Sequence, residues 1–189
     1  MKLHLPFRAA VCRATVVTAL AGPLALSPSA EAATQGTQGA TSTGTVAISA
    51  SVPSRVRITG LADVAFTNQD PAVAALDAQD VCVWSNTATR GYSITATGSG
   101  TANAFSISNG STTVPYTVQW STSAGNTSGS ALTAGTAATG LVSVASSNQC
   151  ASGPANSASL IVGIGTADLS AMQAGTNYTG TLTLVVAPE

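Results

Sequence analysis

Ionisable side chains are scarce in this sequence, and histidine is the scarcest of them. Charged residues make up 7% of the 189 positions, and the single histidine is His4. Imidazole supplies many of the general bases, activated nucleophiles and zinc ligands of enzymes, so a chain whose body lacks it lacks the usual groups for that chemistry. No motif pairs a nucleophile with a base. The sequence therefore predicts no enzymatic activity, no cofactor and no metal site.

The first 32 residues have the organisation of a secretory signal peptide. An apolar stretch at 14–26 follows a basic start, and small residues at Ala30-Glu31-Ala32 offer a cleavage site. The basic residues are Lys2, Arg8 and Arg13. The apolar stretch is too short to cross a bilayer, and no later run reaches the ~18 apolar residues that a spanning helix needs. We expect cleavage after Ala32, export of the remainder, and no membrane span.

Few charges remain once this segment is removed. Residues 33–189 contain no lysine, and their only cations are Arg55, Arg57 and Arg90. Six carboxylates oppose them, which gives a net charge of about −3. These are Asp63, Asp70, Asp77, Asp80, Asp168 and Glu189. A nucleic-acid-binding surface needs a basic stripe, which this composition does not provide.

The aspartates also lack the spacing of a calcium-binding loop. We interpret Asp70, Asp77 and Asp80 as solvated loop residues. Two cysteines follow the signal, Cys82 and Cys150, and an even number in an exported protein is typical of a disulfide. This bond would close a loop of roughly 70 residues and stabilise the fold by roughly 4 kcal/mol in the chain-entropy treatment.

Short stretches of alternating polarity, separated by Gly, Ser, Thr and Asn clusters, fill the rest of the chain. This pattern is typical of an antiparallel sandwich, so the predicted fold class is all-β. The expected strands are 55–58 continued at 64–66, then 81–84, 91–97, 105–107, 114–120, 141–144, 160–164 and 178–187. Residues 71–76 (PAVAAL) look briefly helical. The side chains expected in the core include Trp84, Tyr92, Tyr116 and Trp120.

The most regular alternation lies near the start of the exported chain, at residues 45–52. It follows a polar leader at 33–44, and Pro53 after it disfavours a tight hairpin. One face of the stretch consists of Val46, Ile48, Ala50 and Val52. Two interpretations stay open. The stretch is an ordinary edge strand of its own sheet, or it is carried to a neighbouring molecule by β-augmentation, which would cover an otherwise hazardous apolar strand.

Three segments together resemble the subunits of bacterial chaperone–usher pili. They are GTVAISASVPSRVRITGLADVAF (44–66), VCVWSNTATRGYSITATGSG (81–100) and GTNYTGTLTLVVAPE (175–189). The nearest types are archaic pilins with a spore-coat-U-like domain and alpha-class fimbrial pilins. The resemblance implies an incomplete immunoglobulin-like sandwich at 53–189, whose missing strand is supplied by the N-terminal extension of the next subunit.

By position, the resemblance makes residues 45–52 the donor strand, which would insert Val46, Ile48, Ala50 and Val52. The acceptor groove would be lined on one wall by Val56 and Ile58, and on the other by Leu182, Leu184 and Val186. The implied partners are identical or related pilin subunits, a periplasmic chaperone and an outer-membrane usher. The implied location is a fimbria on the cell surface, reached through the periplasm.

Two features depart from that family. Arg55 stands where archaic pilins usually carry a cysteine, which suggests that Cys82 pairs with Cys150 instead of with the first strand. The ending Pro188-Glu189 lacks the aromatic residue common in the best-known pilins. The alternative function is a self-contained, secreted immunoglobulin-like module, a surface or adhesive protein that does not polymerise.

Overall fold

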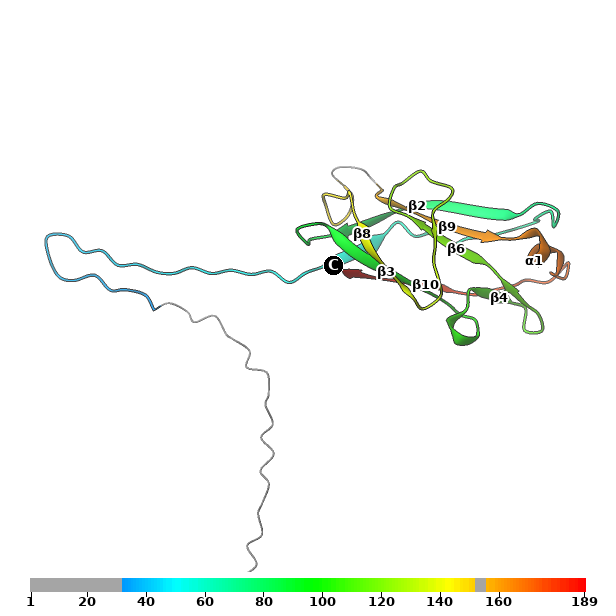
Figure 1. Cartoon of the computed structure of the whole chain (residues 1–189), viewed down its shortest axis with the longest axis horizontal. Coiled ribbons are helices and arrows are strands. Elements are labelled where there is room, and N and C mark those ends of the chain that lie inside the picture. The colour runs from blue at the N-terminus through cyan, green and yellow to red at the C-terminus, as the bar shows by residue number, and fades with distance from the viewer. Residues whose placement is uncertain (1–31, 152–155) are drawn as a thin grey trace, which may run out of the picture. The chain divides into compact units, whose positions relative to one another are not determined.

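The structure, a computed structural model, describes residues 32–151 and 156–189 (Figure 1). The predicted signal peptide lies outside the described residues, apart from Ala32. The chain divides into two compact units, Met1–Ser51 and Val52–Glu189. In the first unit, Thr34 and Thr45 form an antiparallel bridge in which each backbone N–H donates to the other's carbonyl oxygen at 3.0 Å. The polar leader at 33–44 is therefore closed into a loop.

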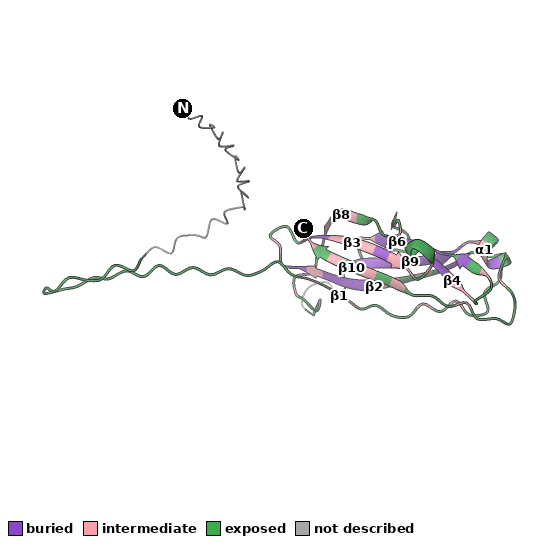
Figure 2. Ribbon diagram, turned by 90° about the horizontal axis from the view of Figure 1, so that it is seen from below, coloured by how far each residue is buried: buried purple, intermediate pink, exposed green. Residues whose placement is uncertain are grey.

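The second unit is an antiparallel β-sandwich, which confirms the predicted all-β class (Figures 1 and 2). The first sheet has the order β1 (Val56–Thr59), β2 (Ala75–Ser85), β9 (Ala158–Ile164), β6 (Thr117–Ser121), β7 (Ser130–Ala131). The second has the order β10 (Leu182–Pro188), β3 (Gly91–Gly98), β8 (Ala137–Val142). A separate hairpin consists of β4 (Ser106–Ser108) and β5 (Thr113–Pro115). The short helical elements are η1 (Thr101–Asn103) and α1 (Thr166–Ser170).

The core lies between the two sheets and is built from the side chains that point inward at alternate positions along the strands. All seven residues of β9 are buried, as expected for the central strand of the larger sheet. Of the four aromatic residues expected in the core, Tyr92, Tyr116 and Trp120 are buried in it. Trp84 lies instead beside a second, smaller cluster that contains both cysteines.

Several local predictions were wrong. Residues 71–73 form a turn and β2 begins at Ala75, so 71–76 is not helical. Gly60, at φ +86°, ends β1, and residues 64–66 form no strand. Asp77 and Asp80 lie within β2 and not in loops. The last strand begins at Leu182 and not at 178, and β8 covers 137–142 in place of the predicted 141–144. The short helix α1 was not predicted.

No helix in the described part of the chain is long and apolar enough to cross a bilayer.

Candidate functional site

Strands β1 and β10 each have a free edge. Within the described residues, β1 pairs only with β2, from Val56↔Ser85 to Thr59↔Cys82, and β10 pairs only with β3. Each strand ends the order of its own sheet, and the two contact each other across the side of the sandwich (Figure 2). We call this pair of unpaired edges, Val56–Thr59 and Leu182–Pro188, the open seam.

The turn between β2 and β3 fixes one end of the open seam. Asn86 holds the chain that enters β1: its backbone N–H donates to the Arg55 carbonyl at 3.0 Å, and its side-chain amide donates to the Pro53 carbonyl at 2.9 Å. The backbone N–H of Glu189, after β10, donates to the carbonyl of Gly91 at 3.1 Å. β1 therefore starts where β10 finishes, and the two strands run in opposite directions along the seam.

The apolar side chains of the seam pack on the core without being fully covered. On β1, Val56 and Ile58 are half-buried against it. On β10 burial alternates, and the half-buried residues on the core face are Leu182, Leu184 and Val186. Val185, on the opposite face of β10, is 56% exposed. The structure thus brings the five predicted acceptor residues to two adjacent free edges.

Other residues extend the same apolar surface, and the sequence prediction did not include them. Val64, Phe66 and Tyr178 are half-buried against the core at the far end of the seam. The chain before Val64 is held to β2 by a side chain instead of a ladder. The Ala62 N–H donates to Oε1 of Gln79 at 2.7 Å, and Nε2 of Gln79 donates back to the Ala62 carbonyl at 3.1 Å. The alternation at 64–66 was a sequence signal for Val64 and Phe66.

The predicted donor residues belong to neither sheet. No strand of the sandwich includes residues 45–52, and the side chains of Val46, Ile48 and Val52 are 76%, 92% and 84% exposed. Ala50 is exposed as well. These four apolar side chains, spaced two residues apart, are therefore exposed along one face of the segment.

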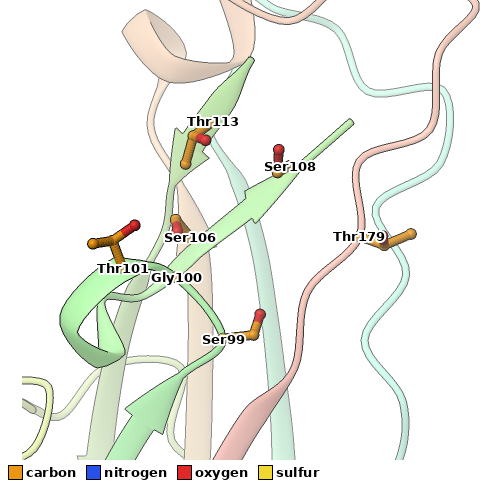
Figure 3. A pocket seen from close by; sticks show the side chains of 7 residues that line it. All are labelled: Ser99, Gly100, Thr101, Ser106, Ser108, Thr113 and Thr179. Atoms are coloured by element: carbon orange, nitrogen blue, oxygen red, sulfur yellow. The ribbon is translucent and has the colours of Figure 1, made fainter. Parts of the chain in front are cut away.

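Two hollows are lined by residues outside the open seam. The first has a volume of about 210 Å³ and is surrounded by hydroxyl-bearing residues near η1 and the β4–β5 hairpin (Figure 3). Its lining is Ser99, Gly100, Thr101, Ser106, Ser108, Thr113 and Thr179. The second, of about 520 Å³, lies between β6–β7 and β8. Neither lining contains an ionisable side chain, and the described residues include no cluster of three or more His, Cys, Asp or Glu.

The predicted disulfide between Cys82 and Cys150 is present, with 6.0 Å between the Cα atoms. Both cysteines are buried with Ala145, and Trp84 packs against them. Because Cys82 is paired with Thr59 in the β1–β2 ladder, the bond anchors the loop after β8 next to β1. It therefore supports the strand that forms one wall of the open seam.

The fold and the seam define an antiparallel β-sandwich in which an edge of each sheet is left unpaired at the same side. No protein-family model matches the sequence, and no curated protein matches it.

Proposed function

We propose that this protein is a structural subunit of a surface fimbria, and that it polymerises by donating residues 45–52 to the open seam of a neighbouring copy. The observation that carries this proposal is the coexistence, in one chain, of an uncovered alternating apolar segment and an uncovered pair of strand edges. Each is an aggregation hazard by itself, and strand donation between copies covers both at once.

The dimensions of the two parts agree. An extended segment of eight residues spans about 26 Å, and the seven residues of β10 span about 23 Å at ~3.3 Å per residue. A strand laid along the seam can hydrogen-bond to the free edge of β10, and because β1 and β10 already contact each other, β1 must move aside for the strand to pair with both edges. Alternate side chains of the donor then point inward, toward the half-buried residues of the seam.

The energetics favour a persistent joint. Each fully buried Val or Ile side chain contributes about 1.5–3 kcal/mol, and the donor offers Val46, Ile48 and Val52 together with the smaller Ala50. Their present exposure of 76%, 92% and 84% means that almost all of this gain is available on association. The inserted strand also adds a backbone ladder along β10, so dissociation requires breaking many contacts at once.

This mode of assembly is the one used by chaperone–usher pilins, which the sequence resembles. The proposed partners are accordingly other copies of this chain or related subunits, a periplasmic chaperone that covers the seam before assembly, and an outer-membrane usher. The proposed route is export through the periplasm to the cell surface, and the role is structural and not catalytic.

The decisive experiment separates the donor from the acceptor. The exported chain shortened to begin at Ser54 lacks the donor but keeps the sandwich, and we expect it to form no fibres while binding a synthetic peptide of residues 45–52. The control peptide carries Ile48→Asp, which places a charge on the inserted face, and should not bind. Fibres of normal length from the shortened chain would overturn the proposal and favour the self-contained module.

A further inference from the structure

The three cations of residues 33–189 gather at one end of the sandwich. Arg55 and Arg57 lie at the start of β1, and Arg90 lies in the turn between β2 and β3. The hydrogen bond from the Asn86 N–H to the Arg55 carbonyl joins these two places. All three arginines are exposed. We call this end, defined by Arg55, Arg57 and Arg90, the basic pole.

Three carboxylates gather at the other end. Asp77 lies near the start of β2, Asp70 lies in the turn that precedes that strand, and Asp168 lies in α1, which follows β9. The pairing of Ala75 with Ile164 brings the start of β2 and the end of β9 together, so the three carboxylates share this end of the sandwich. Figure 1 shows α1 at the end opposite to the C-terminus. We call this end, defined by Asp70, Asp77 and Asp168, the acidic pole.

The two poles lie toward opposite ends of β2. Its 11 residues span about 36 Å at ~3.3 Å per residue. Asp80 lies in the middle of β2, and Asp63 follows Ala62, which is hydrogen-bonded to Gln79 of the same strand, so Asp63 lies next to the acidic pole. Glu189 supplies the one side-chain carboxylate at the basic pole, and its Oε2 already accepts a hydrogen bond of 2.7 Å from the backbone N–H of Gly140. The sandwich therefore carries opposite charge at its two ends despite its low charge content.

We infer that the basic pole of one copy docks on the acidic pole of the next, and that this contact guides strand donation. The inference rests on the proposed function. The donor segment enters the sandwich at Pro53, which the Asn86 side chain fixes at the basic pole. When residues 45–52 of one copy lie in a neighbour's seam, Val52 of the donor reaches one end of that seam. The donor's basic pole must therefore sit beside the pole of the neighbour at that end.

Charge decides between the two directions of insertion. β10 runs from the acidic end to the basic end, because it finishes next to Gly91. A donor antiparallel to β10 ends at the neighbour's acidic pole and brings opposite charges together. A donor parallel to β10 ends at the basic pole and opposes arginine to arginine. Like-charge contact opposes the second arrangement, so the poles select head-to-tail stacking.

Complementary poles act chiefly on the rate of encounter. Electrostatic steering raises association rates by about 10- to 1,000-fold at low ionic strength, and salt removes the effect. The donor segment TVAISASV has no charged residue, so its own insertion is insensitive to salt. Assembly of whole subunits should thus depend on ionic strength, whereas uptake of the isolated peptide should not.

The test reverses one charge at each pole. In the exported full chain at about 0.01 M salt, Arg55→Glu and Asp70→Lys should each slow fibre growth by about tenfold, and the double variant should recover to within about twofold of the wild type. At about 1 M salt all four proteins should grow at similar rates. Glu189→Lys is the matched control for Asp70→Lys, because it changes the net charge equally but lies at the basic pole, and it should not slow growth.

Net charge alone gives a different result. A chain of net charge about −3 becomes less self-repelling with either lysine variant, so the net-charge explanation has Asp70→Lys growing faster, which would overturn the pole contact. Equal growth rates in all variants would also overturn the pole contact. Binding of the 45–52 peptide by each variant, shortened to begin at Ser54, checks that its seam is intact. A wild-type chain that neither forms fibres nor, once shortened, takes up the peptide would refute the proposed function itself.

Discussion

The indole N–H of Trp120 in β6 donates a hydrogen bond of 3.0 Å to the phenol oxygen of Tyr92 in β3, and so joins the two sheets through the core. Both side chains are buried. Tyr116, also buried, differs: its hydroxyl has no hydrogen-bond partner among the described residues. The ring of Tyr116 stacks on Phe105 with 5.7 Å between centroids. The two tyrosines thus hold their rings in the same core but use their hydroxyls differently.

Removing these two hydroxyls should have different effects on stability. Tyr92→Phe leaves the Trp120 N–H buried without an acceptor, so we expect the free energy of unfolding to fall by about 1–3 kcal/mol. Tyr116→Phe removes a polar atom that makes no hydrogen bond, and the change should be near zero or slightly stabilising. Urea unfolding of both variants measures the difference. Equal losses would mean that the Trp120–Tyr92 bond contributes nothing specific.

Replacing both cysteines by alanine should destabilise the sandwich. The disulfide joins residues 68 apart, and a loop of that size gives about 4 kcal/mol in the chain-entropy treatment. Reduction of the disulfide in the wild type should lower the denaturant midpoint about as far as the double alanine substitution does. This measurement controls for the loss of the two cysteine side chains. An unchanged midpoint in the double alanine variant would show that the unfolded chain is already constrained in this region.

Much of the fold follows from alternation in the sequence, and its exceptions have a common cause. Gly91–Gly98 and Ala158–Ile164 were predicted nearly to their ends because their apolar residues are regular. β2 was predicted at less than half its length, because its first half contains Asp77, Gln79 and Asp80. Tertiary hydrogen bonds to Gln79 and Asp80 satisfy these polar groups within a strand. A pattern along one chain segment does not contain those partners.

The candidate site was predicted less completely than the strands. Val56 and Ile58, and the three residues of β10, were named from the family resemblance, and the structure places both sets on free edges. The contribution of Phe66 to the apolar surface of the seam was missed, because residues 64–66 pack there without forming a strand. The poles could not have been predicted, since Asp70 and Asp168 are brought to one end only by the pairing of β2 with β9.

Acid should loosen the loop that follows β6. Asp80 Oδ1 accepts hydrogen bonds of 2.7 Å from the Gly125 N–H and from the Ser159 hydroxyl, and these bonds, the one from Gly125 first, lower the pKa of this carboxyl. A lowered folded-state pKa means that the ionised form is favoured by folding. Its stabilising contribution is complete above the unfolded-state value of about 3.9, and it is lost as the pH falls through the lower folded-state pKa.

Asp80→Asn tests this acid dependence, because the amide oxygen can still accept both hydrogen bonds but does not ionise. We expect hydrogen exchange of the Gly125 amide to accelerate in the wild type at low pH, relative to its intrinsic rate, and to show a smaller change in the variant. Asp63→Asn is the control, since Asp63 is an exposed carboxylate elsewhere in the chain. Identical pH profiles for the wild type and Asp80→Asn would show that another group controls the loop.

A charge on the inserted face of the donor should abolish assembly without affecting the subunit that carries it. Ile48 is 92% exposed, so Ile48→Asp removes almost no buried surface and should leave the unfolding midpoint of the free subunit unchanged. Insertion into a neighbour would bury that carboxylate without a partner, which costs several kcal/mol and outweighs the lost isoleucine contact. Ser49→Asp is the matched control, because Ser49 lies on the opposite face of an extended strand and its substitute would remain in water. We expect fibres from Ser49→Asp and none from Ile48→Asp.

Because the Ile48→Asp chain keeps a normal seam, it should still cap the growing end when added in excess to the wild type, and should shorten the fibres. Equal assembly of the two variants would show that the alternation at 45–52 does not determine which face is inserted.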